Sequence, residues 1–201
     1  VNNLARGLVL NCYNSLFAGN EALENAVSHN VSLQYFSFNM LNYTNVFGSI
    51  NYNKRIDQIR SLTNFESVIR TNTPFNSPFA DESVSANGSF QRRFGKLQAT
   101  LAGNFSYSKF NQFIQGQQSV NESYTQSYSP RLRTNFKTAP NVEVSYRYTI
   151  SDNDQGATRN KFFTHAPTIE FDALIWNSLT FKTDYSYNNL RNQSGTLNSF
   201  E

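Results

Sequence analysis

The sequence predicts an all-β chain, built as an antiparallel up-and-down transmembrane β-barrel with about eight long strands. Three observations predict this fold class. Apolar and polar residues alternate with a period of two through most of the chain, which is the pattern of strands with two different faces. Only 15% of the 201 residues are charged, against about a quarter in ordinary soluble domains. The connections between the predicted strands alternate between short and long, as in bacterial outer-membrane barrels.

The clearest strand is the segment KLQATLAGNFSYSK, residues 96–109. Leu97, Leu101 and Phe105 fall on one face, and Thr100 and Asn104 fall on the other. About eleven residues at roughly 3.3 Å each give a strand of more than 30 Å, about twice the length usual in globular proteins. A strand of this length with one apolar and one polar face fits a wall that separates lipid from a polar lumen.

Seven further segments continue this pattern along the chain. The first covers residues 31–40, where a change of parity at 36–40 predicts a β-bulge. The others are residues 46–53, 84–91, 124–137, 142–150, 163–172 and 179–187. The chain is therefore divided into an irregular extracellular lead-in loop at 1–27, transmembrane β-barrel strands at 28–190, and a loop or truncated end at 191–201.

The predicted connections give the barrel its orientation. Short turns are expected at 41–44, 94–96, 138–141 and 173–178, and longer polar connections at 61–81, 111–122 and 151–161. Outer-membrane barrels have short periplasmic turns and long extracellular loops, so the three long connections are expected on the extracellular side. Aromatic residues that would form girdles at the two interfaces lie near both sets of strand ends: Phe94, Phe136, Phe171 and Trp176 at the short turns, and Tyr52, Tyr107, Tyr148, Tyr185 and Tyr187 toward the long connections.

The parity of the most regular strands also predicts which side chains face lipid. These are Leu97, Leu101, Phe105, Val144, Tyr146, Phe181 and Tyr185. The opposite parity carries charges of both signs, as expected for a lumen in which neighbouring strands neutralise one another: Arg131, Arg133, Lys137, Glu143, Arg147, Glu170, Asp172, Lys182 and Asp184. If Phe171 pairs with Phe181, Glu170 and Lys182 form a cross-strand ion pair, and Thr168 lies opposite Asp184.

Composition excludes several other classes of protein. No run of about 18 apolar residues could span a bilayer as a helix. The net charge of +3 comes from scattered Lys and Arg, whereas a nucleic-acid interface would gather them on one element beside stacking aromatics. Cys12 is the only cysteine, so an internal disulfide or a cysteine-based metal cage is not expected.

The sequence offers no catalytic, cofactor-binding or metal-binding residues, and we do not expect an enzyme. His29 and His165 are far apart and neither has a partner at metal-ligand spacing; they are interpreted as a strand-entry residue and an interfacial residue. The stretch DNDQG, residues 152–156, resembles the start of a calcium loop, but Phe163 stands where the twelfth-position Glu is needed.

The segment SLFAGNEALENAVSHNVSLQY, residues 15–35, resembles the GNPxLxPExSHNxxLxY segment of Bacteroidetes outer-membrane β-barrel proteins of the TonB-dependent receptor type. The stretches FGKLQATLAGNFSYSK, residues 94–109, and SYSPRLRTNF, residues 127–136, are similar to strand and turn segments of the same family. The matching positions in the first segment are Gly19, Asn20, Leu23, Ser28, His29, Asn30, Leu33 and Tyr35. Glu21, Glu24 and Asn25 depart from it, since the family usually has Pro, Pro and Glu there.

The resemblance implies a C-terminal part of a larger barrel of about twenty-two strands with a plugged lumen. It implies a receptor and transporter for nutrient uptake in the bacterial outer membrane. The expected partners are outer-membrane lipid, the rest of the barrel and its plug domain, TonB through the plug, an extracellular nutrient and a surface lipoprotein.

Two other interpretations remain open. Eight strands can also close into a complete small barrel with a structural or adhesive role. A soluble β-rich binding module, in which two sheets pack through their apolar faces, would show the same period of two.

Overall fold

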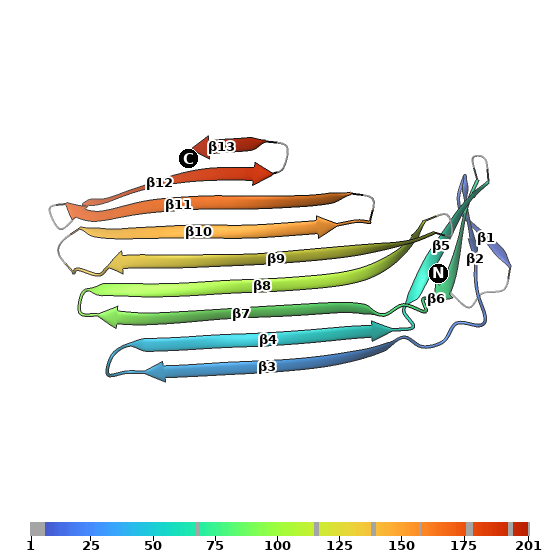
Figure 1. The fold of residues 1–201 in the computed structure, drawn as a ribbon, viewed down its shortest axis with the longest axis horizontal. Helices are drawn as coiled ribbons and strands as arrows, with labels where there is room; N and C mark the ends of the chain where they lie inside the picture. The colour runs from blue at the N-terminus through green and yellow to red at the C-terminus, as the bar shows by residue number, and fades with distance from the viewer. Residues whose placement is uncertain are drawn as a thin grey trace.

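The computed structural model describes residues 7–66, 69–114, 117–137, 140–156, 158–175, 179–192 and 195–200. Within these residues the chain is all-β, with thirteen strands and no helix. Accordingly, the described part of the chain contains no helix long and apolar enough to cross a membrane. The strands form two sheets, one of nine strands and one of four (Figure 1).

The large sheet is a series of antiparallel neighbours in the order β13-β12-β11-β10-β9-β8-β7-β4-β3. Its strands are long because the alternating pattern continues through each of them, and most have 13 to 18 residues. Their bounds are β3 Val27–Asn39, β4 Thr44–Ile56, β7 Asp81–Phe94, β8 Leu97–Ile114, β9 Gln117–Thr134, β10 Asn141–Asp154, β11 Arg159–Ile175, β12 Leu179–Asn192 and β13 Thr196–Phe200. The prediction of an all-β, antiparallel up-and-down arrangement is confirmed for this sheet.

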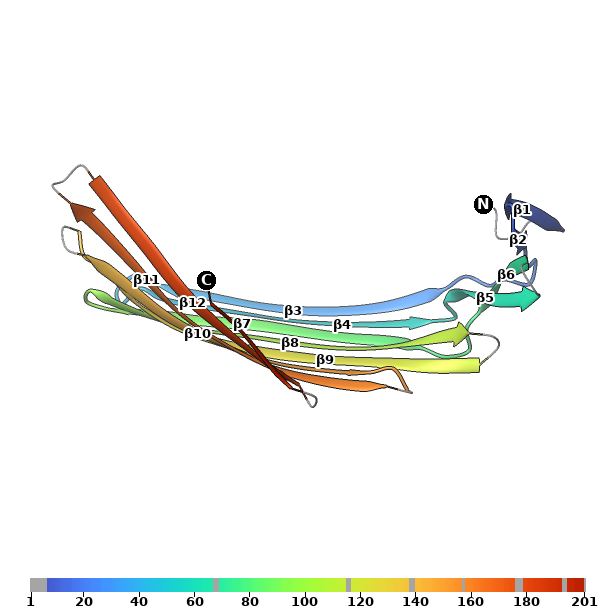
Figure 2. The same cartoon turned by 90° about the horizontal axis from the view of Figure 1, so that it is seen from above.

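The large sheet is bowed but does not close on itself (Figure 2). Its two edges are β3 and β13, which do not pair with each other. The residues described here therefore form an open sheet and not a complete barrel.

The small sheet has the order β1-β2-β6-β5 and lies at one end of the large sheet (Figures 1 and 2). Its strands are β1 Leu8–Cys12, β2 Ser15–Ala18, β5 Ile59–Glu66 and β6 Ile69–Asn76. The pairing of β2 with β6 is parallel and joins residues more than fifty positions apart. The expectation that residues 1–27 are irregular is wrong for β1 and β2. The backbone hydrogen bonds of β2 are completed by β6, and β1 pairs with the other edge of β2.

Polar side chains attach the small sheet to the large one. The Asn76 side chain donates to the carbonyls of Glu24 and Asp57 at 2.8 and 2.7 Å. Arg60 on β5 forms an ion pair with Asp81 at the start of β7. The same Asp81 accepts a hydrogen bond from the backbone N–H of Asn111 at 3.0 Å. Since these bonds join β5, β7 and β8, the small sheet is fixed to the end of the large one.

Two expectations about strand ends are corrected by the structure. The long connections predicted at 61–81, 111–122 and 151–161 are mostly strand, because β5 and β6 form a hairpin and β8 to β11 extend toward their tips. The predicted bulge at 36–40 is absent, since β3 and β4 pair without interruption from Val27 to Asn39. The change of parity instead places Phe36 and Phe38 on the otherwise polar face.

The hairpin between β11 and β12 has a different register from the one predicted. Phe171 lies opposite Thr183, and Glu170 lies opposite Asp184. Lys182 is the partner of Asp172, and Thr168 is the partner of Ser186. The predicted pairing of Glu170 with Lys182 is therefore wrong by two residues. A shift of two keeps every side chain on its face, so the alternating pattern could not distinguish the two registers.

Candidate functional site

The candidate site is a surface: the two faces of the nine-stranded sheet. Along the register, Leu101 on β8 has Phe90 on β7 and Pro130 on β9 beside it. We call the side of the sheet that carries these three residues the apolar face. The seven side chains predicted to face lipid all lie on it.

The apolar face is uncovered. No hydrophobic side chain among the described residues is buried. Leu101 is 54% exposed, Ile169 on β11 51% and Tyr185 on β12 53%. Soluble monomers rarely expose a continuous apolar patch larger than a few hundred Å², so a surface of this kind marks contact with lipid or with another protein.

A row of ionisable side chains, which we call the charged row, borders the apolar face at the end where the small sheet lies. Its members are direct neighbours on successive strands: His29, Lys54, Glu82, Lys109, Glu122, Asp154 and Arg159. Two ion pairs form within the row, Lys54 with Glu82 and Lys109 with Glu122, each at 3.1 Å. From β3 to β9 the first large apolar side chain lies two residues from the row, and on β10 and β11 Asp152 and Lys161 lie between the row and the apolar side chains.

The lower limit of the apolar face, on the side of the short turns, runs obliquely across the sheet. Its last large apolar side chain is Tyr35 on β3 and Leu179 on β12, and along the register this limit moves by about ten residues over seven strand-to-strand steps. At roughly 3.3 Å per residue and 4.8 Å per strand, about 1.4 residues per step is a tilt of about 45°. Strands of membrane barrels are tilted by about 35–45°. The upper limit stays two residues from the charged row from β3 to β9 and recedes only on β10 to β12.

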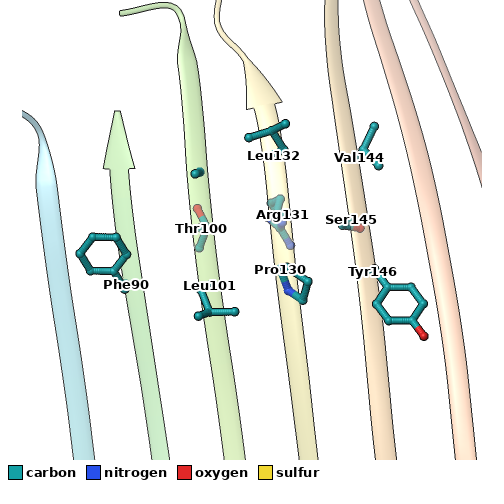
Figure 3. A pocket seen from close by; sticks show the side chains of 10 residues that line it. Phe90, Thr100, Leu101, Pro130, Arg131, Leu132, Val144, Ser145 and Tyr146 are labelled. Atoms are coloured by element: carbon teal, nitrogen blue, oxygen red, sulfur yellow. The ribbon is translucent and has the colours of Figure 1, made fainter. Parts of the chain in front are cut away.

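An open hollow of about 420 Å³ lies on the apolar face around Pro130 (Figure 3). Phe90, Leu101, Leu132 and Tyr146 surround it. Pro130 has no N–H to donate, and the pairing of β9 with β10 is interrupted at this residue before continuing in the same alignment.

The opposite, polar face carries mostly Ser, Thr, Asn and Gln, with a charged cluster near the short turns. Arg131 contacts Glu143 at 3.0 Å, and Arg133 lies 3.9 Å from Glu143 and 3.8 Å from Asp172. Glu143 is only 9% exposed, so the two guanidinium groups balance a nearly buried carboxylate. The charges predicted for a lumen share this face, apart from Lys137, which lies beyond the end of β9.

The two histidines lie far apart, on β3 and β11, with five strands between them in the sheet. His165 has the Tyr146 hydroxyl 2.5 Å from its Nδ1 atom and stacks on Tyr148 with ring centres 4.8 Å apart. Within the described residues no group of three His, Cys, Asp or Glu side chains could hold a metal ion.

The stretch 152–156 forms the tip of the β10–β11 hairpin, beyond the apolar face. Arg159 donates two hydrogen bonds to the Asp152 carboxylate, at 2.9 and 2.7 Å, and these bonds lower the pKa of that carboxyl. Asp154 accepts from the backbone N–H of Gly156, whose φ is +78°. Both carboxylates thus have partners within the hairpin.

Sequence reasoning missed the charged row, the hollow and the contacts of His165. Each depends on the alignment of three or more strands, and single strands carry no signal for it. Trp176, which was assigned to an aromatic girdle, lies outside the described residues.

Comparison of the chain with protein-family models, with curated protein sequences and with solved structures finds no match.

Proposed function

We propose that this chain is part of the wall of a transmembrane β-barrel in a bacterial outer membrane. In this arrangement the apolar face contacts lipid and the polar face lines the lumen. The observation that carries the proposal is the exposed apolar face, with charge along one border and an oblique limit on the other, because the slope of that limit agrees with the tilt of membrane-barrel strands.

The open edges fit a wall that continues on both sides. β3 and β13 present unpaired backbone groups, and a bilayer does not tolerate unpaired sheet edges. Further strands that pair with β3 and β13 satisfy these groups in a closed barrel. A complete eight-stranded barrel is less well supported, because it needs strands at the two opposite edges of this sheet to pair with each other.

We further propose that the barrel belongs to a receptor and transporter of the TonB-dependent type that takes up a nutrient. The similarity of residues 15–35 to that family supports this assignment. Its plug, TonB and a surface lipoprotein are then the partners, and the chain itself supplies scaffold and loops rather than catalysis. The small sheet and the long hairpin tips lie on the extracellular side in this proposal.

The test of the proposed placement uses the full protein with single cysteines in a cysteine-free background. Gln155 lies at the β10–β11 tip and Lys96 in the β7–β8 turn, at opposite ends of the sheet. An impermeant thiol reagent on intact cells should label Gln155→Cys and leave Lys96→Cys unlabelled until the cells are broken. Labelling of Lys96→Cys alone would reverse the orientation, and recovery of the protein without detergent would reject the membrane barrel.

A further inference from the structure

Three hollows on the apolar face share residues and form one continuous groove. The hollow around Pro130 shares Leu101, Pro130 and Tyr146 with a second hollow of about 420 Å³. The second shares Tyr148 and His165 with a third of about 450 Å³, which extends to Arg191 on β12. The groove thus runs from β12 to β7, and one end differs in chemistry from the other.

One small residue, Ala99, lines the apolar part of the groove and lies opposite Arg92 and Leu132. Its methyl group leaves space between Leu101 and Leu132. Beside it, Pro130 contributes only its ring. The lining here is almost wholly apolar, as expected for a site that holds a hydrocarbon chain.

The other end of the groove is cationic. Lys161 lies over the Phe163 ring at 5.2 Å, and Arg191 is the strand partner of Phe163. Within the described residues neither cation forms an ion pair with a carboxylate. The register partner of Lys161, Asp152, is held by both donors of Arg159.

This lack of partners distinguishes Lys161 and Arg191 from the other cations along the same border. Lys54 is paired with Glu82, Lys109 with Glu122, and Arg159 with Asp152. With Asp152 and Asp154 on the same hairpin, the border around Arg159, Lys161 and Arg191 carries a net charge of +1 beside the mouth of the groove. Long basic side chains at the edge of a bilayer reach toward the headgroups.

The direction of the groove matches that of a lipid. A line perpendicular to the oblique lower limit of the apolar face crosses one strand toward β3 for about every 1.5 residues along the strand. From Arg191 on β12 to Pro130 on β9 the shift is three strands and four residues, or about 20 Å. The groove thus runs close to the proposed membrane normal, over about the thickness of one leaflet with its headgroups, which is about 20–22 Å.

We propose that this groove is a binding site for one anionic, phosphate-bearing membrane lipid. Lys161 and Arg191 hold the phosphate, Tyr148 and His165 line the neck, and an acyl chain lies over Pro130 between Leu101 and Tyr146. Arg is well suited to the phosphate because its planar group can donate two parallel hydrogen bonds. The inference rests on the membrane placement proposed above.

The experiment measures lipid binding to the full protein, purified in detergent, by native mass spectrometry. Phosphatidylglycerol is the anionic probe, phosphatidylcholine the neutral headgroup control, and inorganic phosphate the test for a free anion. The wild-type protein should retain phosphatidylglycerol in preference to phosphatidylcholine. The double variant Lys161→Gln, Arg191→Gln should bind phosphatidylglycerol about 30-fold more weakly, on the scale of two cations at an anionic surface.

Two further variants test the groove separately from its charge. Ala99→Phe fills the apolar end of the groove and leaves both cations in place. It should weaken the binding of both phosphatidylglycerol and phosphatidylcholine. The matched control, Arg147→Gln with Lys182→Gln, removes the same charge from the polar face and should retain phosphatidylglycerol as the wild type does.

The proposed site would be overturned if the polar-face control lost as much affinity for phosphatidylglycerol as the double variant Lys161→Gln, Arg191→Gln. It would also be overturned if inorganic phosphate bound as tightly as the lipid. A protein that fractionates with membranes but shows no preference between the lipids would reject the groove and leave the proposed barrel standing. A protein that needs no detergent would reject the barrel itself.

Discussion

Replacing Leu101 by Arg tests the assignment of the apolar face to lipid. In β8 the apolar band extends from Tyr107 to Leu97. Leu101 is six residues from the first and four from the second, which places it about 2 Å from the middle of the band at the proposed tilt. An Arg at the midplane of a membrane barrel costs about 2–4 kcal/mol. That loss lowers the ratio of folded to unfolded protein by roughly 30-fold to 1,000-fold.

Thr100→Arg is the matched control, because it puts the same side chain one residue away on the polar face. Tyr107→Arg, at the border of the band, should cost only about 0–1 kcal/mol. The assay refolds the full protein into vesicles and measures the folded fraction from its altered electrophoretic mobility without heating, over a urea series. Similar losses for Leu101→Arg and Thr100→Arg would refute the reasoning, since no difference between the faces would then remain.

Two further predictions concern stability. Removing the charge in Glu143→Gln should lower the free energy of unfolding by roughly 1 kcal/mol, because Arg131 loses a partner at 3.0 Å. In the same urea series Glu170→Gln should raise it slightly, because Glu170 lies directly opposite the carboxylates of Glu143 and Asp184. Gly95→Ala should cost about 1–2 kcal/mol, because Gly95 has a φ of +62° in the β7–β8 turn. Gly48→Ala on β4, with no atom within 4 Å of the added Cβ, should cost much less, and equal midpoints for the two alanine variants would contradict the turn argument.

The sequence predicted the faces of the strands well because the period of two is a local property. Val144 and Phe181 fall on the same face as Leu101, although they lie on three different strands. The turn between β7 and β8 was also predicted correctly, since Gly95 supplies the left-handed conformation that a two-residue hairpin turn needs. Each of these features is set by residues close together in the chain.

The features that the sequence did not predict depend on residues far apart. The parallel pairing of β2 with β6 joins Leu16 to Thr71. No sequence pattern in either segment predicts that the two would pair. The register of β11 on β12 places Glu170 opposite Asp184, and a slip of two residues preserves every face. The alternating pattern is equally satisfied by both registers.

The sequence by itself determined that the chain is all-β, which side chains share a face, and that one face is apolar and the other polar. The tertiary structure decided how the strands align, and therefore where the charged row lies, how the apolar band is tilted, and which residues line the groove from Arg191 to Pro130. The physical reason is that side-chain direction follows from the backbone of a single strand, whereas alignment is a property of pairs of strands. Only when nine strands are placed in register does a pattern of alternating residues become a surface with borders, a slope and a site.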